Sequence, residues 1–158
     1  MHPKLLRRYT KLETDRKMLL AGLMHTPHDK LNYSPSGRWL VSQILTHLVT
    51  SERMSLIYMK KKSQDIDQVG NSSLIESFKL LALKMSQRLP LRYKAPQVLV
   101  ENTPEPMPLP AVIKKWNTIR MDLYTFPEAM HEENIRKKIY KHPIAGRLDV
   151  LQADGVLP

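Results

Sequence analysis

The side chains of this chain that could do chemistry include histidines, carboxylates and an excess of basic groups. Cysteine is absent. Disulfides, thiolate metal sites and cysteine nucleophiles are therefore excluded, and a metal would need His, Asp or Glu as ligands. The patterns G-x-x-x-x-G-K-[ST], G-x-G-x-x-G, H-E-x-x-H and G-x-S-x-G do not occur. The common signatures of phosphate-binding, dinucleotide-binding, zinc-protease and hydrolase sites are thus missing.

His47 is the histidine whose position is most informative. It lies at the edge of an apolar helix face that includes Leu45 and Leu48. Taken alone, such a histidine is usually a core-lining side chain whose ring nitrogens bind a backbone carbonyl or water. Glu52 follows five residues later, about 140° around a helix, so the two side chains do not share a face. We interpret Glu52 as structural, paired with a basic neighbour.

The charge balance favours anionic partners. Lys and Arg number 25 and Asp and Glu 15, which gives a formal charge of +10. Nucleic acid, acidic surfaces and charged small molecules all suit such an excess. The runs Lys60–Lys62 and Lys137–Lys138 could contact phosphates, but short basic runs are common at helix C-termini, and we interpret both as solvated helix ends. No helix-turn-helix or zinc-finger spacing accompanies them.

The length of 158 residues and the 42% hydrophobic content fit one globular domain over residues 1–158. Few glycines and aromatics favour helix over an all-β fold. Apolar residues at helical spacing, bounded by proline and capping residues, predict helices over residues 3–24, 39–62, 73–89 and 110–126. The predicted core stripes of the last two helices are Leu74, Phe78, Leu81, Met85 and Leu89, and Val112, Trp116, Ile119, Leu123 and Phe126.

The segments between and after these helices are less regular. Six prolines within residues 90–110 predict an extended crossover, with residues 98–100 against the bundle. Residues 142–146 are typical of a turn, and the chain after Arg147 has room for two or three helical turns at most. No apolar stretch approaches the ~20 residues of a membrane-spanning helix, and no secretory signal is convincing, so we expect a cytoplasmic protein.

Two stretches resemble the DinB/YfiT-like superfamily. The segment from Trp39 to Arg53 is similar to its W-x(7)-H-L-x(3)-E-R signature, and the segment from His142 to Leu148 is similar to the H-P-x-x-G-x-L turn before the last helix of many members. The resemblance implies an all-α, up-down four-helix bundle with a long crossover, often dimeric. It also implies a divalent metal (Zn, Ni, Fe or Mn) held by three histidines, one of them at the position of His47.

The resemblance is incomplete at the metal site. The other two ligands of the family come from an H-x-x-x-H pair on the final helix, and no histidine follows His142 here. We therefore expect a last helix that is cut short and a site that lacks two ligands. Replacement ligands could come from His25, His28, His131, Glu132 or Glu133, although nearness in sequence does not show that they converge on His47.

Two functions follow as expectations. The first is a DinB-like metal-dependent enzyme, of hydrolase or thiol-transferase type, with an incomplete metal site and an anionic small molecule as substrate. The alternative is a non-catalytic dimeric interaction module that binds nucleic acid electrostatically. A homodimer is expected in either case, because a bundle without its last helix leaves apolar faces to be covered.

Overall fold

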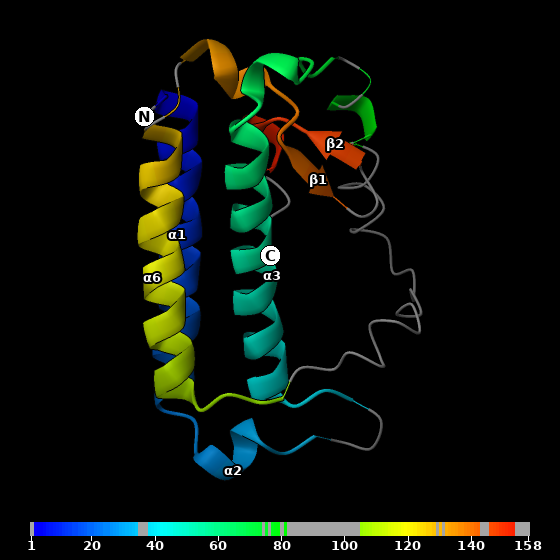
Figure 1. The fold of residues 1–158 in the computed structure, drawn as a ribbon. Coiled ribbons are helices and arrows are strands. Elements are labelled where there is room, and N and C mark those ends of the chain that lie inside the picture. Colours follow the sequence, from blue (N-terminus) through cyan, green and yellow to red (C-terminus); the bar gives the residue numbers. More distant parts are fainter. Residues whose placement is uncertain are drawn as a thin grey trace.

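The computed structural model describes residues 2–34, 38–73, 75, 77–79, 81, 105–128, 130, 132–142 and 146–153. The chain is mostly helical, with one small two-stranded sheet. Three long helices, α1 (Pro3–Met24), α3 (Val41–Ser63) and α6 (Leu109–Glu128), lie side by side (Figure 1). Helix α1 runs antiparallel to α3 and α6, which run parallel to each other (Figure 1). The chain between α3 and α6 therefore returns from one end of the bundle to the other.

The shorter elements lie at the two ends of the bundle (Figure 1). They are α2 (His28–Leu31), η1 (Ile66–Gln68), η2 (Glu132–Arg136), β1 (Tyr140–His142), β2 (Gly146–Leu148) and α7 (Val150–Ala153). Within the described residues, no helix combines the length and the apolar character needed to cross a bilayer.

Helix α1 has the bounds predicted from its proline and its apolar spacing. Pro3 occupies the first turn, where its missing N–H costs nothing, and the His2 ring accepts a hydrogen bond from the Lys4 N–H at 3.2 Å. Helix α3 begins two residues later than predicted, at Val41. The Leu40 side chain cannot cap the helix. Instead, the side-chain oxygen of Gln43 accepts a hydrogen bond from the Leu40 backbone N–H at 2.9 Å.

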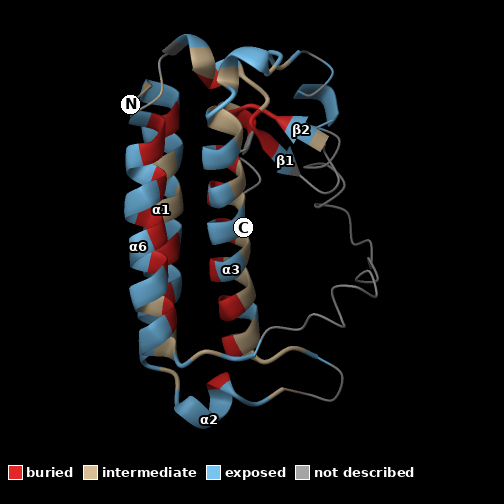
Figure 2. Cartoon of the chain, in the orientation of Figure 1, coloured by how far each residue is buried: buried red, intermediate tan, exposed pale blue. Residues whose placement is uncertain are grey.

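The buried residues of the three long helices lie on the sides that face one another, and the outer sides are exposed (Figure 2). All five residues of the α6 stripe predicted from the sequence are buried, which confirms that prediction. They form one cluster with Leu45, Val49, Leu56 and Met59 of α3 and with Leu5 and Leu20 of α1. Each such side chain contributes roughly 1.5–3 kcal/mol when fully buried, so this cluster is the main source of the bundle's stability.

A β-hairpin closes one end of the core, and the sequence did not predict it. Strands β1 and β2 pair antiparallel, with Tyr140 opposite Leu148, and both of these side chains are buried. Ser72 N–H donates to the Arg136 carbonyl at 2.8 Å, which ties the segment after α3 to the segment before the hairpin. The turn predicted at residues 142–146 has its two end residues in β1 and β2, and residues 143–145 lie outside the described part of the chain.

The predicted third helix is only partly described. Residues 75, 77–79 and 81 are helical, but Phe78 is 72% and Leu81 55% exposed. The prediction that these two side chains belong to a core stripe is therefore wrong: spacing identifies an apolar face, but burial requires an element to pack on it. Leu74, Met85, Leu89 and the crossover over residues 90–104 lie outside the described residues, so the fourth helix of a bundle stays a prediction.

Candidate functional site

A buried cluster of charges joins the three long helices. The Arg120 Nη2 of α6 lies 2.8 Å from Glu52 Oε1 of α3, and the Trp116 indole N–H donates to the other oxygen of Glu52. Glu13 of α1 lies 3.4 Å from Arg120 Nε and accepts from Arg16 at 2.8 and 3.1 Å. Glu52 is 1% and Arg120 3% exposed. The cluster thus holds two acids and two arginines whose charges cancel.

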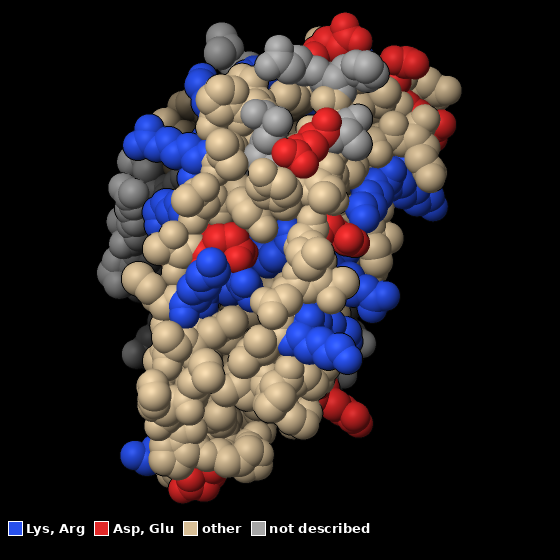
Figure 3. Space-filling model, turned by 90° about the vertical axis from the view of Figure 1, so that its left-hand side faces the viewer, with Lys and Arg blue, Asp and Glu red and all other residues tan. Residues whose placement is uncertain are grey.

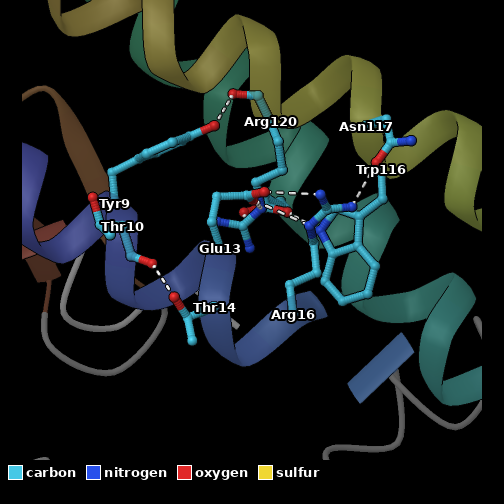
Figure 4. A network of polar contacts seen from close by, with 9 residues as sticks. Tyr9, Thr10, Glu13, Thr14, Arg16, Trp116, Asn117 and Arg120 are labelled. Atoms are coloured by element: carbon cyan, nitrogen blue, oxygen red, sulfur yellow. Dashed lines mark hydrogen bonds and ion pairs between the residues drawn. The ribbon is translucent and has the colours of Figure 1, made fainter. Parts of the chain in front are cut away.

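Further contacts fix this cluster from its sides (Figure 4). The Tyr9 hydroxyl donates to the Arg120 backbone carbonyl at 3.0 Å, and Arg16 Nη1 donates to the Asn117 side chain at 2.7 Å. The guanidinium carbons of Arg16 and Arg120 lie 5.7 and 5.8 Å from the Trp116 ring centroid, within cation–π range. The Arg120 contact confirms the predicted pairing of Glu52 with a basic residue.

The environment of Glu52 shifts its titration. Burial raises the pKa of Glu52 above its ordinary value of 4.5, because the charged form loses its hydration, while the Arg120 guanidinium and the Trp116 N–H oppose the rise. Glu52 Oε1 and the Arg120 Nε and Nη1 atoms have no hydrogen-bond partner among the described residues. The Glu52–Arg120 contact is therefore an ion pair without the geometry of a hydrogen bond. Such a contact compensates only part of the free energy that it costs to remove the two charges from water.

His47 lies on a different face of α3 and outside this cluster. Its ring is half-buried and packs edge-on against Trp39, with 5.1 Å between the ring centroids. Its Nε2 lies 3.4 Å from the Ser51 hydroxyl. Across the described residues, no group of three or more His, Asp or Glu side chains could hold a metal ion. One imidazole and a hydroxyl do not complete a divalent metal site. The role of His47 as a metal ligand is therefore untested by the described residues and stays a prediction.

The other predicted candidates are scattered. His25 and His28 are exposed near the C-terminal end of α1, and Glu133 is exposed in η2. His131 and the Glu132 side chain lie outside the description. Lys60 is not a purely solvated helix end, because its ammonium pairs with Asp122 of α6 at 3.1 Å. Lys137 and Lys138 follow η2 and make backbone contacts with Asn71 and Gly70, so they do not end an α-helix as expected.

The structure instead brings basic groups together in a groove between α3 and α6. Its volume is about 700 Å³. Apolar side chains from both helices and from the segment before α6 make its floor: Leu56, Ile57, Met107, Ala111 and Ile119. Among the described residues, four cationic side chains line it, Arg53, Lys60, Lys114 and Lys115, together with one acid, Asp122. The groove thus offers an apolar surface beside positive charge.

The sequence shows which residues of each helix share a face, but not that the two faces meet. Arg53, Leu56, Ile57 and Lys60 are spaced to lie on one helix face, and Lys114, Lys115 and Thr118 are spaced similarly. What the sequence cannot supply is the rotation of two helices, far apart in the chain, that turns these faces toward each other. The neighbouring face over α1 and α6 carries Lys and Arg across its middle, and Asp and Glu at its upper end and at separate points in its middle and lower parts (Figure 3).

No family model, curated protein or solved structure matches this chain. The resemblance to the DinB/YfiT-like superfamily accordingly rests on the two motifs around His47 and Gly146, and the function has to be argued from the residues themselves.

Replacing Glu52 by Gln tests the buried charge cluster through pH. A raised pKa means that the folded chain binds the Glu52 proton more tightly than the unfolded chain. This contribution to stability is complete below about pH 4.5 and is lost as the pH rises through the folded-state pKa. The free energy of unfolding of both proteins is measured in urea at several pH values. The value for the wild type, relative to that for Glu52→Gln, should fall between about pH 4.5 and neutrality. A relative free energy of unfolding that stays constant, or that rises over this pH range, contradicts the raised pKa of Glu52.

The prediction that His47 is a metal ligand has a direct consequence. Gently purified, untagged protein then contains near-stoichiometric Zn, Ni, Fe or Mn by elemental analysis, and His47→Ala loses it. Ser55→Ala, one helical turn beyond Ser51 on α3, is the control and keeps the metal. Equal metal content in wild type and His47→Ala contradicts the assignment.

Proposed function

We propose that this chain is a non-catalytic binding module that takes an anionic small molecule with an apolar portion into the α3–α6 groove. The observation that carries the proposal is the coincidence of charge and apolar surface in one place. Lys60 already has a partner in Asp122, so Arg53, Lys114 and Lys115 supply the positive charge that a ligand would meet. A single carboxylate or phosphate group beside these side chains would be attracted by their charges and could accept hydrogen bonds from them.

The floor of the groove decides which kind of anion fits. Leu56 is buried and Ile57 is 45% exposed, so part of this apolar surface faces solvent when the groove is open. A ligand with an apolar portion would remove that surface from water, at roughly 25 cal/mol per Å². A purely polar anion would leave it wet. The groove is therefore better suited to an amphiphile than to a free phosphate or a sugar phosphate.

Nucleic acid fits the groove less well. Single-stranded binding needs aromatic side chains on which bases stack, but Trp116 and Phe126 belong to the buried core. The groove is floored by aliphatic side chains, which offer no stacking surface. The high net charge would still attract a polyanion, so nucleic-acid binding is the competing outcome of the experiment below.

Metal-dependent catalysis, the first expectation from the sequence, is a separate proposal. It rests on His47 and the resemblance around it, and the described residues near His47 supply no further His, Asp or Glu ligand group. The homodimer is likewise a proposal. Large apolar side chains are exposed on α1, namely Leu6, Met18, Leu19 and Met24, and a measurement of oligomeric state would show whether a second copy covers them.

Reversing one charge of the groove tests the proposed function. Isothermal titration with decanoate should show binding to the wild type that Lys114→Glu weakens about tenfold, because one attraction is replaced by a repulsion. Lys17→Glu on α1 makes the same change in net charge away from the groove and should shift the affinity less than about twofold. Decanol, which has the same chain without the charge, should not distinguish the two variants.

Three results would overturn this proposal. The first is an absence of decanoate binding to the wild type. The second is an equal loss in Lys114→Glu and Lys17→Glu, which would show that net charge rather than the groove matters. The third is tight, steeply salt-dependent binding of a labelled oligonucleotide that displaces decanoate and is weakened by Lys114→Glu, which would assign the groove to nucleic acid.

A further inference from the structure

A second cavity lies at the end of the bundle where α2 sits. Its volume is about 200 Å³. Leu31, Leu45 and Leu109 line it together with two prolines of the segment before α6, and Leu31 and Leu45 are buried. A cavity of comparable size, about 150 Å³, with apolar walls accepts a small hydrocarbon. This cavity is therefore large enough to hold part of an apolar chain.

The Ser42 and Asn32 side chains that line the cavity already have hydrogen-bond partners. The Ser42 hydroxyl donates to the Asn32 side-chain oxygen at 2.8 Å, and the Asn32 side-chain N–H₂ donates to the His28 backbone carbonyl at 3.0 Å. A ligand that enters therefore meets few polar groups in need of a partner, and apolar atoms suit the space.

Met107 lines both this cavity and the α3–α6 groove. Its backbone N–H donates to the Thr46 hydroxyl of α3 at 3.0 Å, which fixes the main chain at this point. Its sulfur lies 3.8 Å from the Lys115 ammonium, so the side chain extends along the groove wall. Methionine is unbranched and has three rotatable side-chain bonds, which lets it yield to an entering group more readily than a branched residue would.

We infer that the ligand of the groove is an unbranched acyl or alkyl chain with one terminal anionic group, and that its tail passes Met107 into the second cavity. The inference rests on the proposed function, because the groove must first hold the anionic head near Arg53 and Lys114. Met107 then determines how the protein distinguishes chain lengths. Short chains end within the groove. Longer chains displace the methionine side chain and contact the apolar walls of the second cavity.

Chain length is the measurable consequence. Each methylene that becomes buried strengthens binding about fourfold, so the ratio of the hexadecanoate to the octanoate affinity should be large in the wild type. Met107→Trp puts a bulky, rigid ring at the passage and should collapse this ratio. Met107→Ala widens the passage and should preserve or increase it. Met121→Trp is the matched control, because Met121 is 70% exposed on α6 and lines neither cavity.

The experiment measures the affinities of octanoate, dodecanoate and hexadecanoate, below their micelle concentrations, for wild type and the three variants. Circular dichroism melting of each variant shows that it folds. A collapsed ratio in Met107→Trp alone supports the inference. A flat chain-length dependence in the wild type, or an unchanged ratio in Met107→Trp, overturns it while leaving the proposed function in place. If no fatty acid binds the wild type, both fail together.

Discussion

The ion pair between Glu52 and Arg120 is the contact that fixes how α3 and α6 are placed relative to each other. It joins α3 to α6 inside the core, and Glu13 and Arg16 connect it to α1. Glu52 and the two arginines are buried and Glu13 is half-buried. This arrangement is tolerated because the two negative and two positive charges cancel, whereas removing one partner of a buried pair typically costs about 3–5 kcal/mol. The cluster therefore constrains how the three helices can rotate and slide against one another.

The groove is a consequence of that constraint. Beyond the buried pair, Lys60 of α3 pairs with Asp122 of α6. Thr46 of α3 also accepts a hydrogen bond from the backbone N–H of Met107, in the segment that leads into α6. Between these ties the apolar side chains of the two helices do not fill the space completely, and the lysines and Arg53 stand along its sides. The position of the positive charge thus follows from the packing of the core.

The sequence predicted the long helices well because two physical signals agree there. Apolar spacing and proline punctuation fixed residues 3–24 and the α6 stripe around Trp116, and the rotation between His47 and Glu52 predicted a structural role for Glu52. The hairpin was missed because each strand has three residues, too few for an alternating pattern. Phe78 shows the converse: its spacing marks an apolar face, but only a packing partner buries it.

The candidate site was less predictable than the fold. His47 stands out in the sequence because its neighbours resemble a known motif, yet its described surroundings are Trp39 and Ser51. The groove has no motif of its own. Its residues come from two helices and a Pro-rich segment, and each of its lysines taken alone is an ordinary solvated side chain. Net charge indicated an anionic partner, and only the fold placed that charge beside an apolar floor.

Methyl NMR tests the central claim most directly, because it reports where a ligand sits without any substitution. Protein labelled at its Ile and Met methyl groups is titrated with dodecanoate. The account predicts shifts at Met107, Ile57 and Ile119, which line the groove, and none at Met18 or Met24, which are exposed on α1. Shifts confined to the α1 methionines, or no shifts at all, would contradict it.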